Sequence, residues 1–296
     1  MLKEVIVTNA SKETLVMNLS KPWASNINVK NISGISPMDV EVISSKNGFY
    51  DGEKLNLLRK GSREIVFTLG LVSNVGKIEE ARHKVYKYFP IKEKVSVTFN
   101  TDTNLLKIDG YVQSNETDIF SKDETSIIKL YCPDPWFSSV NGSVFAFLEG
   151  APLFEFPFSN ESTDKNLIVM SEIQSNSKTV IKNKGVSTGA KFNILFGENI
   201  QDSMLNQNYE LVVEYNSQIE KFVFNPKGAR NFELCTEDGG KYFVNKSTGE
   251  NWVKNVDILN CSWPKIGNGS SSVYVNGYSQ VDISVEILIT EKYEGL

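Results

Sequence analysis

The stretch YCPDPWF, residues 131–137, decides how the chain is divided. It follows the strand-like segment SIIKLY and precedes a new series of strand-like segments that begins near Val144. Pro133 and Pro135 cannot donate to a sheet ladder, and each favours extended geometry in the residue before it. A strand must therefore end here with a stiff exit, which predicts a joint between two domains, residues 1–137 and 138–296.

The joint itself is assigned to six residues: Cys132, Pro133, Asp134, Pro135, Trp136 and Phe137. An aspartate between prolines is suited to accept backbone N–H bonds in a turn rather than to titrate near neutrality. We expect the two aromatic residues to anchor the joint in a core. The small polar residues SSVNGS that follow are expected to be the protease-sensitive part.

The composition sets broad limits on the class of protein. The 296 residues are 40% hydrophobic and 23% charged, which is ordinary for a globular protein of one large or two average domains. No apolar run approaches the roughly 20 residues that span a bilayer, and the first ten residues alternate like a strand rather than like a secretory signal. We therefore expect a protein that folds in a cytoplasm, without insertion into a membrane.

Charge and cysteine content exclude further classes. The formal net charge is −5 and no basic block occurs, whereas a nucleic-acid partner requires clustered lysine and arginine. The three cysteines, Cys132, Cys235 and Cys261, include no CxxC pair. They predict free, partly buried thiols rather than a disulfide framework or a zinc site.

Hydrophobic periodicity predicts a mainly β chain. Residues that alternate with polar neighbours occur in at least three segments: Ile65, Phe67 and Leu69; Val95, Val97 and Phe99; Val281, Ile283, Val285 and Ile287. Alternation of this kind is typical of antiparallel sheets with one solvated face. Short turn clusters such as KNGFYDGEK and TEDGG separate the segments.

One segment has helical spacing instead. Ile78, Ala81, Val85 and Tyr88 recur at intervals of three or four after Ser73, a candidate N-cap, and Pro90 ends the pattern. Acidic residues lie toward the start and lysines toward the end, as the helix dipole favours. The first domain is therefore expected to carry one packed helix.

The chemical motifs are weak. GLVSNVGKI, residues 70–78, differs from a phosphate-binding loop in its glycine spacing, and Ile78 stands where serine or threonine is required, so a strand-to-helix turn is the better interpretation. The single histidine, His83, falls off the apolar stripe of the helix and is expected on the surface. Histidine-based catalysis is therefore not predicted.

Two larger sets remain open to interpretation. Five carboxylates are candidates for a glycosidase pair: Asp134, Glu155, Glu233, Glu237 and Asp238. Four aromatic residues suit either a sugar-stacking platform or a core: Trp252, Trp263, Tyr274 and Tyr278. Nothing singles out a pair among the acids, and core positions are ordinary for aromatic residues in strands. We predict no catalytic, cofactor-binding or metal-binding residues, and no enzyme.

Several segments together resemble a known family. The aromatic-Cys-Pro-Asp-Pro-Trp/Phe stretch is the most specific, and DILNCSWPKIGNGSSSVYV, residues 257–275, is the second. YDGEKLNLLRKGSREIVFTLGL, residues 50–71, fits an early hairpin, and the chain ends with EKYEGL. These features resemble the distal tail proteins of tailed bacteriophages, which are siphovirus-type tail components.

The resemblance implies a fold and a role. The first domain would be a β-sandwich-like, ring-forming domain with one α-helix, and the second a galectin-like or jelly-roll β-sandwich, with the last residues packing back on the first. Six copies would form a hub ring at the tail tip or baseplate of a virion, assembled in the bacterial host cytoplasm. The implied partners are other copies of the chain, the tail tube protein, the tail-tip hub protein, and receptor-binding proteins or host surface glycans.

Two alternatives from other classes stay open. The second domain would also suit a carbohydrate- or receptor-binding module, which glycan binding would reveal. A carboxylate-dependent glycosidase would show turnover on cell-wall polysaccharide. The hub role differs from both in its oligomeric state.

Overall fold

The computed structural model describes residues 1–46, 48–49, 51–72, 78–121, 123–146, 148–152, 171–175, 178–198, 200–276 and 283–296. Contacts divide the chain into two compact units, Met1–Asn141 with Lys292–Leu296, and Gly142–Glu291. The chain therefore passes from one unit to the other twice. The predicted mainly β fold is confirmed, since strands make up most of the described regular structure.

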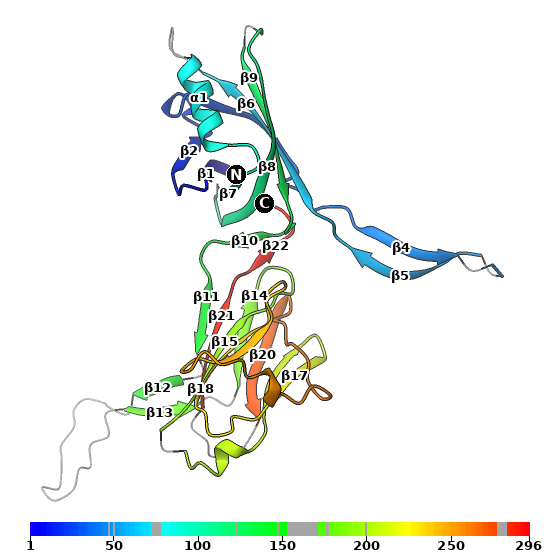
Figure 1. Cartoon of the computed structure of the whole chain (residues 1–296), viewed down its shortest axis with the longest axis vertical. Helices are drawn as coiled ribbons and strands as arrows, with labels where there is room; N and C mark the ends of the chain where they lie inside the picture. The colour runs from blue at the N-terminus through cyan, green and yellow to red at the C-terminus, as the bar shows by residue number, and fades with distance from the viewer. Residues whose placement is uncertain are drawn as a thin grey trace, which may run out of the picture. The chain divides into compact units, whose positions relative to one another are not determined.

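The first unit is built on one antiparallel sheet, shown in the upper part of Figure 1. Its strands pair in the order β2-β1-β7-β8-β9-β6-β3, while β10 pairs with both β8 and β22. The bounds are β1 Leu2–Thr8, β2 Thr14–Asn18, β3 Ile27–Ser33, β6 Arg63–Leu71, β7 Lys94–Thr101, β8 Leu105–Asp118, β9 Thr125–Cys132, β10 Phe137–Ser139 and β22 Lys292–Tyr293. A 3-10 turn, η1, spans Pro22–Ala24 between β2 and β3.

Period-two alternation determines which face of this sheet is buried. In β6, Ile65, Phe67 and Leu69 have no exposed surface, as the sequence pattern predicts. The predicted helix is present as α1, Ile78–Tyr88, and packs Ala81 and Val85 into the same core. The expected N-cap, Ser73, lies outside the described residues. Neither α1 nor any other described helix is long and apolar enough to span a bilayer.

A separate hairpin projects from the first unit (Figure 1). It consists of β4, Glu41–Lys46, and β5, Glu53–Arg59, which pair with each other and with no other described strand. We call this hairpin the arm. The stretch 50–71 is thus not a hairpin by itself, because β5 pairs with β4 whereas β6 pairs with β3 and β9.

The second unit is a β-sandwich. One sheet has the order β11-β21-β15-β18-β19, the other has the order β14-β20-β16-β17, and β12 pairs with β13 alone. The bounds are β11 Ser143–Ala146, β12 Leu148–Pro152, β13 Ser171–Ser175, β14 Thr179–Asn183, β15 Lys191–Phe196, β16 Tyr209–Tyr215, β17 Gln218–Phe224, β18 Asn231–Cys235, β19 Tyr242–Asn245, β20 Gly269–Asn276 and β21 Ile283–Ile289. Two 3-10 turns, η2 Met204–Asn206 and η3 Val253–Asn255, complete the described elements.

Aromatic rings fill the core between these two sheets. Phe224 lies 5.2 Å from Phe243 and 5.7 Å from Phe232, measured between ring centroids. Trp252 is 9% exposed, packs 5.7 Å from Phe232, and donates its indole N–H to the Asn225 carbonyl at 3.0 Å. The second unit thus has its own hydrophobic core and does not depend on a disulfide or a structural metal for its packing.

Candidate functional site

The joint predicted from the proline pair begins where β9 ends. β9 stops at Cys132 and β10 starts at Phe137, so that the two prolines lie in the connection. Asp134 accepts the N–H of Trp136 at 3.2 Å, which is the turn-capping role expected of it. Its other oxygen accepts a hydrogen bond from Lys292 at 3.1 Å. Asp134 therefore helps to hold the returning C-terminal strand.

The two aromatic residues of the joint differ in burial. Phe137 is fully buried and packs edge-on to Phe99, with centroids 5.8 Å apart. Trp136 is only half-buried, so the expectation of a core position is wrong for it. The ammonium group of Lys60 lies 4.6 Å from the centre of its ring, a cation–π distance. One side of the indole thus packs against a charged side chain instead of a core.

Arg63 organises the joint, although no sequence pattern singled it out. Its side chain is 2% exposed and donates hydrogen bonds to four backbone carbonyls. The acceptors are Pro135 at 2.7 Å, Ser36 at 2.8 Å, Glu294 at 2.6 Å, and Gly34. These carbonyls belong to three segments that are far apart in the sequence. Arg63 therefore ties the joint, the loop before the arm and the C-terminal segment together.

The Arg63 guanidinium donates to backbone carbonyls, and the charge of Glu294 acts on it as well. Burial lowers the pKa of the guanidinium below its ordinary value, while the nearby Cys132 and Glu294 act to raise it. An arginine stays protonated in proteins, so the four carbonyl dipoles must solvate a permanent cation. The guanidinium also lies 4.7 Å from the centre of the Phe137 ring. We call Arg63 and its four acceptors the carbonyl clamp.

Cys132, the first residue of the joint, is a buried free thiol. Burial raises the pKa of this thiol to about 12, although the nearby Arg63 acts to lower it. It is therefore protonated at neutral pH and is a poor nucleophile. Its sulfur packs over Gly110, where a Cβ atom would lie 2.8 Å from it. The residue fills space beneath the proline turn.

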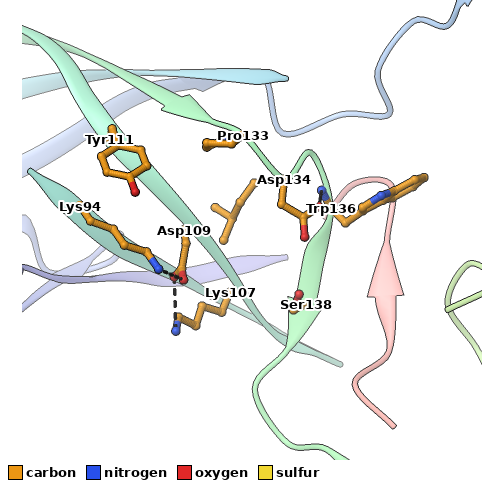
Figure 2. A pocket seen from close by; sticks show the side chains of 9 residues that line it. Lys94, Lys107, Asp109, Tyr111, Pro133, Asp134, Trp136 and Ser138 are labelled. Carbon is orange, nitrogen blue, oxygen red and sulfur yellow. Dashed lines mark hydrogen bonds and ion pairs between the residues drawn. The ribbon is translucent and has the colours of Figure 1, made fainter. Parts of the chain in front are cut away.

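A cleft of about 310 Å³ opens beside the joint (Figure 2). Strand β8 pairs with β9 at Tyr111 and with β10 at Lys107, and the proline connection passes between these two points. The Asp109 carboxylate in the cleft contacts the ammonium groups of Lys94 at 2.9 Å and Lys107 at 3.3 Å. Two cations thus share one anion, and each retains hydrogen-bond donors that face solvent.

The shared carboxylate is ionised at neutral pH. Burial acts to raise the pKa of Asp109, but the hydrogen bonds from Ser96 and Lys94 and the positive charge of Lys107 outweigh it and lower the pKa. The Ser96 hydroxyl donates at 2.6 Å. The cleft therefore presents fixed positive charge next to the exposed ring of Tyr111.

The arm is exposed on both faces. Every residue of β4 and β5 is exposed. The apolar side chains among them are Val42 at 61%, Ile43 at 39%, Leu55 at 54%, Leu57 at 52% and Leu58 at 55%. An isolated two-stranded hairpin is marginally stable in water, and contiguous exposed apolar surface marks an interaction site. The arm is therefore a candidate interaction surface.

The structure describes the surroundings of several other candidates from the sequence one by one. His83 is 69% exposed and lies 3.5 Å from Glu79 on the same helix. Asp134 belongs to the first unit, whereas Glu233, Glu237 and Asp238 belong to the second. Glu233 contacts Lys246 at 3.7 Å and Asp238 contacts Lys265 at 2.9 Å. Glu155, Tyr278 and the glycine-containing stretch 73–77 lie outside the described residues.

The aromatic candidates of the second unit form no exposed platform within the described ranges. Trp252 is buried, and Trp263 is partly buried with its ring 5.4 Å from Phe222. Tyr274 is half-buried and donates its hydroxyl to Glu214 at 2.6 Å. The interpretation of the tryptophans as core residues agrees with their packing. In the part of the chain that the structure describes, no group of three or more His, Cys, Asp or Glu residues is arranged to hold a metal ion.

The fold is shared with a class of phage tail hub proteins. The Dit protein of phage SPP1, described as a paradigm of the hub adsorption apparatus in phages that infect Gram-positive bacteria, matches with a TM-score of 0.59 at 12% identity. The match covers 98% of this chain and 99% of that one. The chain thus has the fold of a distal tail protein, as the resemblance in its sequence predicts.

Two further matches are chains of the phage P2 baseplate in its activated conformation. One, solved with calcium, has a TM-score of 0.44 at 11% identity and covers 100% of both chains. The other, solved with strontium, has a TM-score of 0.40 at 10% identity and covers 96% of this chain and 97% of that one. No protein-family model and no curated protein matches the sequence.

Proposed function

We propose that the chain is a structural protein of a phage tail tip, where six copies form a hub ring that links the tail tube to tip or baseplate proteins. The observation that carries this proposal is the full-length fold match to a hub protein, which includes both units. The proposed location is the virion, after assembly in the bacterial cytoplasm. In this role the function lies in surfaces, and no catalytic step is required.

The exposed arm supports a ring. A ring closes through head-to-tail contacts, which need two different surfaces on each copy rather than one self-complementary patch. The arm supplies a surface that no described residue of its own unit buries, and its two strands pair with no other described strand. A neighbouring copy would cover it. Six such contacts make the ring multivalent toward both the tube and the tip.

The joint lies near the end of the first unit, a few residues before the second unit begins at Gly142. Cys132–Phe137 form the structural joint that we propose, with the carbonyl clamp of Arg63 beneath it. The second unit, as a galectin-like sandwich, would be presented to the tip proteins. Glycan binding by Trp252 and Trp263 is not part of this proposal, because both rings pack in the core.

Electron microscopy of the purified full-length protein tests the proposal. The expected result is a class of six-fold rings, with a mass near 199 kDa for six copies of the 33.2 kDa chain. Imaging of assembled tails should place the same ring at the distal end of the tube. Monomers at every soluble concentration, together with tail tips that lack six-fold density for this chain, would contradict the hub assignment.

A further inference from the structure

An aromatic and basic row crosses the exposed face of the first sheet. Tyr131 in β9 lies directly opposite Tyr111 in β8, and Tyr111 lies directly opposite Lys94 in β7. Both tyrosines are 45% exposed, and Lys94 is exposed as well. Exposed tyrosines that sit side by side on a rigid sheet are typical of binding hot spots. We call Tyr131, Tyr111 and Lys94 the tyrosine row.

The basic end of this row continues into the cleft beside the joint. Figure 2 shows Lys94 and Lys107 reaching the same carboxylate, with the ring of Tyr111 next to them. One carboxylate partly neutralises two ammonium groups, so an additional anionic side chain would be accepted at this end. From β9 to β7, the residues of the row are therefore aromatic, aromatic and basic.

A β-bulge sorts the apolar side chains of the arm onto its two faces. Val42 pairs with Leu58, Ile43 pairs with Leu57, and the register then shifts so that Ser44 pairs with Leu55. Residues directly opposite each other share a face, and successive pairs alternate faces. Leu55 therefore lies on the face of Val42 and Leu58, not on that of Leu57. Without the bulge, Leu55 and Leu57 would share a face.

The face with Leu55 and Leu58 also carries an acid. Lys46 pairs with Glu53, two pairs beyond Ser44 and Leu55, which places both Lys46 and Glu53 on that same face. The Ser44 hydroxyl donates to the Glu53 carboxylate there. From the base of the arm toward its tip, the β5 side of this face is apolar at Leu58, apolar at Leu55 and acidic at Glu53, and the β4 side consists of Val42, Ser44 and Lys46. We call Leu58, Leu55 and Glu53 the docking face. Their order complements that of the tyrosine row in both hydrophobicity and charge.

We propose that the docking face of one copy binds the tyrosine row of the next copy. This inference rests on the proposed ring and names the two surfaces of its head-to-tail contact. Leu58 and Leu55 pack on Tyr131 and Tyr111, while Glu53 approaches Lys94.

An experiment that mixes two variants tests the docking face and the tyrosine row separately. The arm variant Leu55→Ser/Leu58→Ser and the row variant Tyr111→Ser/Tyr131→Ser change exposed side chains, and circular dichroism checks that both fold. Each variant alone is expected to lose assembled species by about tenfold or more, as for hot-spot residues. An equimolar mixture is expected to form dimers but no rings, because the intact arm of one variant meets the intact row of the other.

A matched control comes from the opposite face of the arm. Leu57 is exposed to nearly the same extent as Leu58, at 52% and 55%, so Leu57→Ser should leave assembly unchanged. Cysteine pairs give a direct readout: copies carrying Leu58→Cys and copies carrying Tyr131→Cys should form a disulfide between copies on oxidation. Leu57→Cys with Tyr131→Cys should not.

The outcomes distinguish this contact from the ring itself. Rings that persist in the arm variant or the row variant overturn the contact and leave the hub proposal standing. Disulfide-linked chains that never close into rings support the contact and overturn the six-fold closure. If the Leu58–Tyr131 cysteine pair forms no disulfide, the contact is overturned, and if the wild-type protein also forms no rings in solution or at the tail tip, the hub proposal is overturned with it.

Discussion

Replacing Arg63 by alanine should destabilise the first unit by about 3 to 6 kcal/mol. A hydrogen bond to a charged group contributes about 1.5 to 3 kcal/mol, and Arg63 makes four of them to carbonyls. The four are not additive, because water entering the vacated space would satisfy part of the exposed carbonyls. We therefore take roughly half of the simple sum as the expected loss in the free energy of unfolding.

Urea unfolding and hydrogen exchange together measure this loss. With a slope of about 2 kcal/mol per molar urea, the midpoint of the first unit should fall by about 2 M. Amides of β10 and β22 should lose protection, while those of β15 and β16 in the second unit should not. Arg63→Lys keeps the charge but lacks the planar fork, so an intermediate loss is expected.

Arg59→Ala is the matched control. Arg59 lies on the arm, is 63% exposed and pairs with Glu41 at 3.2 Å, so its loss should cost less than about 1 kcal/mol. The reasoning would be refuted if Arg63→Ala changed the unfolding free energy no more than Arg59→Ala does. Equal destabilisation of both units would also refute it, because all four acceptors belong to the first.

Three more predictions concern the joint and the cleft. Limited proteolysis should nick the chain near residues 141–143 but leave one particle in size-exclusion chromatography, because Lys292–Leu296 stays paired in the first unit; two separating fragments would contradict this. Native Cys132 should be alkylated more slowly at pH 8 than the partly exposed Cys261, although burial raises the pKa of both thiols, and unfolding in urea should abolish the difference. Asp109→Asn should lower stability more at pH 7 than near pH 3. A carboxyl whose folded pKa is depressed contributes stability above its unfolded pKa of about 4 and loses that contribution as the pH falls through the folded value. Urea midpoints at the two pH values would check this, and an equal difference at both would exclude the role assigned to the carboxylate.

The sequence predicts those elements whose pattern depends only on residues close together in the chain. Alternation at Ile65, Phe67 and Leu69 predicts a half-buried strand, and helical spacing at Ala81 and Val85 predicts the helix, because both patterns follow from backbone geometry. The proline pair marks the end of β9 at Cys132, since proline removes the N–H that a ladder requires. These elements are present as predicted.

Neither the burial of Arg63 nor the exposure of the arm could be inferred from local sequence patterns. Arg63 stands in the basic, turn-like stretch RKGSRE and reads as a surface residue; its burial depends on carbonyls about 30, 70 and 230 residues away. The leucines of β5 would suit a buried strand equally well, because a local sequence pattern does not show whether another element covers them. The half-buried position of Trp136 likewise depends on Lys60, which the strand pattern does not place beside it.

The return of the chain to the first unit also has a consequence for biosynthesis. The ribosome makes residues 1–141 first, but Glu294, which supplies one carbonyl of the clamp, follows only after the whole second unit. At about 5 to 20 residues per second, the intervening segment takes on the order of 10 to 30 s to synthesise. Throughout that interval the Arg63 guanidinium lacks one of its four acceptors, the Glu294 carbonyl. Strand β10 likewise lacks the strand that pairs with it at Phe137. A nascent chain that stalls within the second unit never completes the first unit. Completion of the first unit therefore requires translation of the whole second unit.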